Sequence, residues 1–235
     1  MALIKLSSIG ITNLSGKAGG SVYARNRGGN YIRNFAMPSN PKTVAQMAAR
    51  SAFGNLSSQW RSLASDLQNA WNEAAPNFPY KNRFGDQKVL SGFGLFQSLN
   101  RNLQVVGISM LSSPPEPIGV ETLLSVSVAV ENTAGVLSAV ISATPTSAPP
   151  GNTQIAIYAT PPVGSGVRYA ENKLRFIDSV ATASINNYDI SEAYENLFGV
   201  PAVGANVQFA FDPISSISGE RGARLTTVSS VVAGE

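Results

Sequence analysis

Residues 123–130 have the sequence Leu-Leu-Ser-Val-Ser-Val-Ala-Val, and this stretch decides the fold class of the second half of the chain. Its alternation predicts a strand with Leu124, Val126, Val128 and Val130 on one face. Comparable short runs continue to residue 232, and turns at 132–135, 149–152, 164–166 and 218–222 separate several of them. This spacing predicts an antiparallel β-sandwich of the immunoglobulin or fibronectin-III type over residues 113–235. The other expected strands are Val136 to Ala143, Ile155 to Tyr158, Leu174 to Ala181, Val207 to Phe211 and Leu225 to Val232, with a short helix between Ile190 and Phe198.

The residues before this β region, 41–112, show a helical period instead. Apolar side chains recur at spacings of three and four from Phe53 to Leu67, which predicts one apolar stripe along a helix. We expect helices at about 43–63, 66–75 and 91–104, with a stiff Pro-rich linker at 114–117 before the strands. The side chains expected to form the core of this helical region are Phe53, Trp60, Leu63, Trp71, Phe93 and Phe96.

Two capping boxes are expected to start the first two helices. Thr43 is followed by Gln46, and Ser65 is followed by Gln68, so each pair has the spacing of a side-chain cap and its reciprocal partner.

Residues 1–40 form a third region, rich in Gly, Asn, Ser and Arg. Alternating runs at 21–27 and 30–35 flank Gly28 and Gly29, which predicts a β-hairpin in a basic, extended arm. Tyr and Arg recur at alternate positions in both runs, and we expect them to stack across the two strands. A two-stranded ribbon is marginal by itself, so we expect it to lie on another subunit or on the body of the chain, and we expect residues 1–40 to be ordered only by partners. The side chains expected to contact partners are Lys17, Tyr23, Arg25, Arg27, Tyr31, Arg33 and Arg50. The chain as a whole is expected to be α+β.

The composition argues against most catalytic chemistry. The 235 residues include no Cys and no His, so a thiolate nucleophile, an imidazole base and a typical zinc site are excluded. Fourteen acidic residues leave a hard-cation site or a paired-carboxylate hydrolase conceivable. Asp178, Asp189 and Glu192 could lie near one another, but their spacing fits turn and helix-cap roles better. We expect no enzyme activity, metal or cofactor, and no targeting or membrane-spanning segment.

Charge is sparse and unevenly distributed. Charged residues make up 13% of the chain, about half the usual share for a soluble domain. Residues 1–83 hold ten basic and two acidic side chains, a net +8, whereas residues 84–235 hold seven basic and twelve acidic ones, a net −5. The first 65 residues contain no carboxylate side chain. This asymmetry is consistent with a basic segment that contacts nucleic acid or an acidic protein surface, and equally with a basic face that only keeps the chain in solution.

An ordered series of motifs resembles a family of structural virion proteins from tailed bacteriophages of Bacteroidota, including crAss-like phages. The series starts with Gly16-Lys17-x-Gly19, then Val22-Tyr23 and the basic aromatic hairpin. It continues with Asn40-Pro41-Lys42-Thr43-x-x-Gln46-x-x-x-Arg50-x-x-Phe53, Trp60-x-x-Leu63, Ala70-Trp71 and Ser91-Gly92-Phe93-x-Leu95-Phe96 with Asn100, and ends with Ala193-Tyr194, Phe198-Gly199 and Gly204. The resemblance implies a virion location, after assembly in the host cytoplasm, and no catalytic residues.

Three functions follow as expectations. The first is a structural protein that assembles with itself and with capsid, portal or tail proteins, its basic segment meeting the acidic half of a neighbouring copy in a ring or lattice. The second is a nucleic-acid-binding protein that uses the same basic segment. The third and weakest is a carbohydrate-binding tail appendage, for which Tyr158, Tyr169 and Tyr188 are the candidate aromatic residues.

Overall fold

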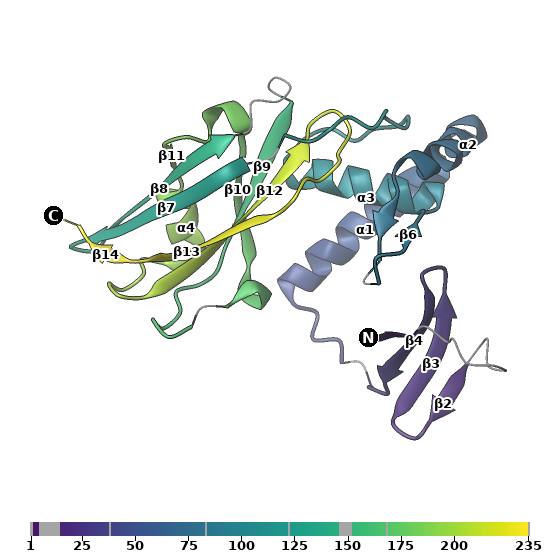
Figure 1. Ribbon diagram of the computed structural model, residues 1–235, viewed down its shortest axis with the longest axis horizontal. Coiled ribbons are helices and arrows are strands. Elements are labelled where there is room, and N and C mark those ends of the chain that lie inside the picture. The colour runs from purple at the N-terminus through teal and green to yellow at the C-terminus, as the bar shows by residue number, and fades with distance from the viewer. Residues whose placement is uncertain are drawn as a thin grey trace.

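The structure is a computed structural model of mixed α+β type, with four α-helices and several antiparallel sheets in the described part of the chain (Figure 1). It describes residues 2–4, 15–37, 39–82, 84–121, 123–145, 152–167 and 169–234.

A small four-stranded sheet lies near the N-terminus, apart from the β region (Figure 1). The expected hairpin is present as β3 and β4, joined by a turn at residues 27–28. Two short strands extend it, so that the strand order is β1-β4-β3-β2 and every pairing is antiparallel. The strands are β1 (Ala2–Ile4), β2 (Gly16–Ala18), β3 (Ser21–Asn26) and β4 (Gly29–Asn34).

Three helices follow at the predicted places: α1 (Val44–Ser62), α2 (Ser65–Ala74) and α3 (Gly92–Val105). The Thr43 side chain caps α1 by accepting a hydrogen bond from the Gln46 backbone N–H at 3.3 Å. The predicted second cap is wrong, because Ser65 is the first residue of α2 and no side chain caps that helix. Gln68 instead donates to the Trp60 and Leu63 carbonyls at the end of α1.

The three helices bury a compact apolar cluster. Trp71 and Phe96 are fully buried in it, and their rings meet edge to face at 5.3 Å. Trp60 and Leu63 are half-buried and pack against the cluster. The Trp71 indole also donates to the Ser112 carbonyl at 2.9 Å, which ties the chain leaving α3 back onto α2. A two-stranded ribbon of β5 (Tyr80–Lys81) and β6 (Gln87–Lys88) lies in the segment between α2 and α3.

The β region contains two four-stranded sheets, ordered β10-β9-β12-β13 and β11-β8-β7-β14. All neighbouring strands are antiparallel except β14, which runs parallel to β7. Helix α4 (Ser191–Phe198) follows β11, where a short helix was predicted. The strands are β7 (Leu123–Thr133), β8 (Val136–Pro145), β9 (Thr153–Ala159), β10 (Arg175–Ala181), β11 (Tyr188–Asp189), β12 (Asn206–Ser215), β13 (Leu225–Ser230) and β14 (Val232–Ala233).

The two sheets share one apolar core, to which β7, β8, β9 and β12 contribute most of the buried side chains. Val128 and Val130 of β7 point into this core as predicted. Leu124 does not, and its side chain is 68% exposed. An irregularity between Leu123 and Ser125 shifts the register by one residue, so that Leu123 is buried in place of Leu124.

Helix α3 joins the helices to the β region. Its C-terminal end packs Val105 and Val106 against Ala156 and Ile214 on the outer face of the β9–β12 pair. The loop after β12 approaches so closely that a Cβ on Gly219 would lie 2.5 Å from the Leu99 carbonyl oxygen. The helices and the β region therefore share a buried interface in addition to the Pro-rich linker.

Among the described helices, none has the length and apolar character needed to cross a lipid bilayer.

Candidate assembly interface

Residues 15–55 have regular secondary structure, but none of their described side chains is buried. From residue 15 to residue 55, leaving aside residue 38, every side chain is exposed or only partly buried, and Leu56 is the first fully buried residue after them. A sheet is stable only when one face is covered by other apolar groups. We define residues 15–37 as the N-terminal sheet segment and take it as the candidate interface.

The register of the hairpin separates the predicted Tyr and Arg rows. Tyr23 lies opposite Ile32, and Ala24 lies opposite Tyr31. Directly opposite residues share a face, so Tyr23 and Arg25 lie on one face while Tyr31 and Arg33 lie on the other. The expected cross-strand stacking between these rows is therefore wrong. A two-residue turn at 27–28 sets this register and places Arg27 in the turn.

The face that carries Tyr31 and Arg33 is both basic and aromatic. Lys17 of β2 lies opposite Val22, which in turn lies opposite Arg33, so Lys17 and Arg33 are on the same face. The Lys17 ammonium lies 4.7 Å from the centre of the half-exposed Phe35 ring. Arg50, the seventh predicted contact residue, lies away from this sheet on α1 and donates to the Asn40 side chain at 2.8 Å.

The first half of α1 extends beyond the helical core. Phe53, predicted to be a core residue, is 58% exposed, which corrects that prediction. Its ring packs edge to face against the half-buried Phe93 ring at the edge of the cluster, with 6.5 Å between the two ring centres. The apolar face of α1 therefore extends beyond the part that packs against the other helices. It borders a groove of about 520 Å³ between α1 and α3, which Phe53, Leu90, Gly94 and Arg101 help to line.

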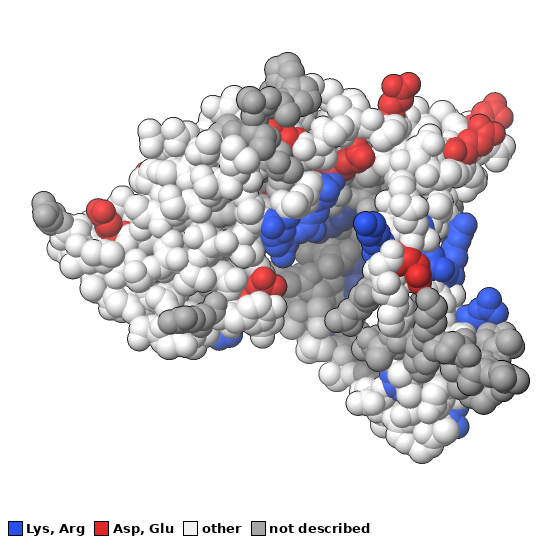
Figure 2. All heavy atoms as spheres, in the orientation of Figure 1, with Lys and Arg blue, Asp and Glu red and all other residues white. Residues whose placement is uncertain are grey.

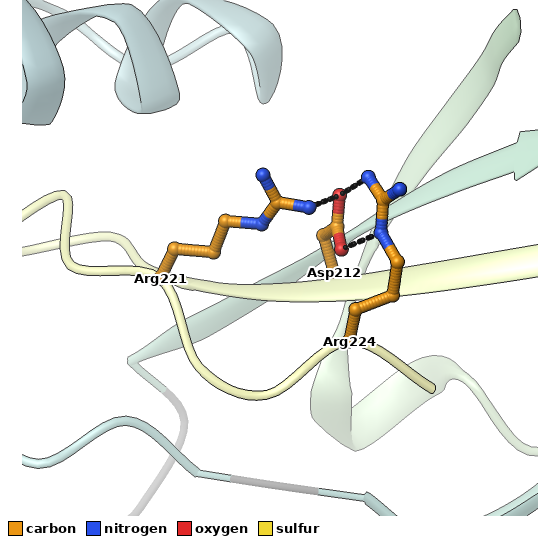
Figure 3. Close-up of polar contacts among 3 residues, drawn as sticks. All are labelled: Asp212, Arg221 and Arg224. Carbon is orange, nitrogen blue, oxygen red and sulfur yellow. Dashed lines mark hydrogen bonds and ion pairs between the residues drawn. The ribbon is translucent and has the colours of Figure 1, made fainter. Parts of the chain in front are cut away.

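The most highly charged arrangement in the β region was not predicted from the sequence. Asp212 of β12 is 1% exposed and accepts two hydrogen bonds from Arg224, from Nε at 2.7 Å and from a terminal nitrogen at 2.6 Å (Figure 3). Arg221 approaches the same carboxylate at 2.5 Å. The Asp212 hydrogen bond raises the pKa of Arg224, whose guanidinium also lies over the Tyr158 ring. Asp212 interrupts the apolar run 209–214, and a buried carboxylate in such a run requires a counter-charge.

The three carboxylates considered for catalysis do lie together. Asp178, Asp189 and Glu192 line one hollow of about 590 Å³. Asp178 accepts a hydrogen bond from the Tyr188 hydroxyl, and Asp189 accepts from the backbone and hydroxyl of Ser191 at the start of α4. The contacts of Asp189 at the start of α4 match its predicted turn or cap role. Asp178 departs from that prediction, because it lies within strand β10 (Arg175–Ala181). Among the described residues, no group of three or more potential ligands is placed to hold a metal ion.

The three tyrosines considered for sugar binding each contact other side chains. Tyr158 packs edge to face on Phe176, and the exposed Tyr169 donates to Glu171. Burial and the nearby Asp212 raise the pKa of Tyr158.

Tyr188 gives the fold an alkaline sensitivity that can be measured. The hydrogen bond to Asp178, together with burial, raises its pKa from 10.0 to about 12. The folded state holds this proton more tightly, so the stabilisation is complete below pH 10 and is lost as the pH rises towards 12. We expect the free energy of unfolding to fall over this interval, and to fall less steeply in Tyr188→Phe. Urea unfolding of both proteins between pH 9 and 12 measures the difference; equal slopes would contradict the assignment to Tyr188.

Charged side chains are sparse and unevenly spread over the face drawn in Figure 2. Figure 2 shows Lys and Arg side chains gathered where the β region meets the helices, with others towards the N-terminal sheet segment. No protein-family model, curated protein or solved structure matches this chain.

Proposed function

We propose that this chain is a non-catalytic structural protein of a tailed-bacteriophage particle, which assembles with copies of itself and with capsid, portal or tail proteins. One observation carries the assembly role: the described side chains from residue 15 to 55 form a sheet and half a helix without burying any residue. Secondary structure without its own core is stabilised when a neighbouring molecule covers it. The motif series supports the virion location.

The proposal includes a division of the chain into three parts. Residues 1–40 act as a basic arm, residues 41–112 as a helical region, and residues 113–235 as an immunoglobulin- or fibronectin-III-like β-sandwich. The shared core between two four-stranded sheets supports the sandwich. The exposed basic side chains of the N-terminal sheet segment support the arm.

Nucleic-acid binding is the second candidate, and the composition of one face of the N-terminal sheet segment favours it. Lys17, Tyr31, Arg33 and Phe35 combine positive charge with aromatic rings on that face. Phosphates and stacked bases are ligands of such a surface. The same face also suits an acidic protein surface, so a substitution experiment must separate the two.

Replacing Arg25, Arg27 and Arg33 together by Ala tests the two candidates. The three positions cover both faces and the turn of the hairpin, so the variant removes charge wherever the partner lies. We expect self-association or particle formation to be lost while circular dichroism shows an intact fold. Assembly is measured by sedimentation velocity, and DNA binding by titration at two salt concentrations, since phosphate contacts weaken steeply with salt.

A matched control removes the same charge elsewhere: Arg61, Lys81 and Arg175, all exposed, replaced together by Ala. This control is expected to assemble normally. If the hairpin variant assembles as well as the control and loses only salt-sensitive DNA binding, the structural role of this segment is wrong and the nucleic-acid role replaces it.

A further inference from the structure

Two arginines in the β region share one buried carboxylate. A terminal nitrogen of Arg221 and one of Arg224 contact the same Oδ2 oxygen of Asp212, at 2.5 and 2.6 Å, so the two guanidinium groups lie side by side. Their side chains are 40% and 35% exposed, whereas the Asp212 side chain is 1% exposed. A single carboxylate cannot neutralise two guanidinium groups, and these groups do not lose their protons. A positive charge therefore remains at the surface.

Both arginines have N–H groups left for a ligand. Arg224 directs Nε and one terminal nitrogen to Asp212, and Arg221 directs one terminal nitrogen to it. Within the described part of the chain, neither side chain makes another hydrogen bond or ion pair. Figure 3 shows the second terminal nitrogen of each guanidinium pointing away from the carboxylate. Because a buried partner already orients these donors, they lose little conformational freedom when an anion binds.

A third arginine, Arg101, reaches the same surface from helix α3. The next residue, Asn102, donates to a carbonyl in the loop between β12 and β13 at 2.8 Å, which is the loop that carries the first of the paired arginines. Burial raises the pKa of Tyr158, and all three arginines act against that rise, so their guanidinium groups lie near the Tyr158 hydroxyl. Figure 2 shows Lys and Arg side chains gathered where the β region meets the helices.

The carboxylates near these arginines do not cancel their charge. Asp212, and to a smaller extent Glu171, raise the pKa of Arg224, so both carboxylates lie near it. Three guanidinium groups and two carboxylates leave a net charge of +1. Glu220, in the loop between β12 and β13, instead accepts hydrogen bonds from a backbone N–H and a serine hydroxyl. The surface therefore favours an anion.

We propose that Arg101, Arg221 and Arg224 bind a phosphate group, either inorganic phosphate or a phosphate of a nucleic-acid strand. The tetrahedral oxygens of a phosphate can accept from guanidinium groups that approach from different elements, whereas the two oxygens of a carboxylate lie in one plane. Beside the paired arginines, the Tyr158 ring packs edge to face on the exposed Phe176 ring, and exposed aromatic surface next to a phosphate suits a base. This site lies outside the N-terminal sheet segment and does not depend on the assembly role.

Phosphate binding to the full chain tests the proposal. Equilibrium dialysis with radiolabelled inorganic phosphate, at constant ionic strength in chloride, is expected to show saturable binding. Arg221→Gln and Arg101→Gln are each expected to weaken it at least about tenfold, because each removes a charged donor. Arg224 stays unchanged, since its two hydrogen bonds hold Asp212. Arg61→Gln, an exposed position on α1, is the matched control and is expected to bind as the wild type does.

A second arm identifies the source of the phosphate. A labelled single-stranded oligonucleotide is titrated by fluorescence anisotropy into the variant that lacks Arg25, Arg27 and Arg33, so that the N-terminal sheet segment does not contribute. A nucleic-acid ligand is expected to bind at least about tenfold more tightly than inorganic phosphate, because the strand adds base contacts. Addition of Arg221→Gln is then expected to weaken it. If the source is free phosphate, the oligonucleotide does not displace radiolabelled phosphate.

Three results would overturn the inference. The first is a wild type that binds no inorganic phosphate in a saturable way. The second is phosphate binding by Arg221→Gln and Arg101→Gln that equals that of Arg61→Gln, while circular dichroism shows all three variants folded. The third is displacement of phosphate by an equal concentration of glutamate, which would make the surface a site for protein carboxylates. None of these results bears on the proposed assembly role, which the hairpin variant tests separately.

Discussion

Replacing Trp71 by Ala is expected to lower the free energy of unfolding by about 3–5 kcal/mol, the range for truncating a fully buried aromatic side chain. Trp71 has no exposed surface, meets Phe96 edge to face, and donates its indole N–H to the Ser112 carbonyl. The substitution opens a cavity between α2 and α3 and leaves that carbonyl without its partner. Urea unfolding followed by circular dichroism measures the loss.

Two further variants make the Trp71 result interpretable. Trp71→Phe retains most of the ring volume and removes the indole donor, so it separates packing from the hydrogen bond. Trp60→Ala serves as the comparison, because the sequence predicts a loss of about 3–5 kcal/mol there too, whereas the structure leaves Trp60 half-buried. We therefore expect Trp60→Ala to cost clearly less than Trp71→Ala. Equal losses, or a loss at Trp71 below about 1 kcal/mol, would contradict the packing described for this cluster.

Replacing Asp212 by Asn is expected to cost about 3 kcal/mol, the lower end of the range for removing one partner of a buried ion pair. The carboxylate is 1% exposed and binds two arginines, so the variant leaves Arg221 and Arg224 close together without the carboxylate that pairs with both. Guanidinium groups cannot lose their proton to relieve this. Both arginine side chains are more than a third exposed, which lets water offset part of the cost.

The comparison for Asp212 is Glu195→Asn, an exposed carboxylate on α4, which is expected to change stability by no more than about 0.5 kcal/mol. Arg224→Ala should cost more than Arg221→Ala, because Arg224 makes two hydrogen bonds to Asp212. An Asp212→Asn protein as stable as the Glu195 variant would show that the Asp212 carboxylate does not stabilise the fold.

The periodic segments could be predicted from the sequence, and the register of the strands could not. The helices from Val44 to Val105 and the main strands lie where spacing and turn residues placed them. The predictions for Leu124 and for the Tyr and Arg side chains of the hairpin were wrong because a shift of one residue changes the face that a side chain occupies. The prediction for Phe53 was wrong because the apolar spacing shows which side of a helix is apolar, but not how much of that side other elements cover.

The candidate interface could be predicted in part. Its position followed from the run of basic residues without carboxylates before Asp66. Its face could not be predicted, because the turn at 27–28 decides which side chains share a surface. The ion cluster at Asp212 had one local signal, a carboxylate inside an apolar run, but its partners come from a loop whose path only the fold determines.

The passage of the chain from β13 to β14 has a consequence for how the molecule opens. Residues 225–230 belong to one sheet, and after Val231 the chain joins the other sheet at β7. Fraying at the edge of either sheet therefore strains the other, and the two sheets open as one cooperative unit. The N-terminal sheet segment shares no buried side chain with that unit, so it can open and close locally while the rest of the molecule stays folded.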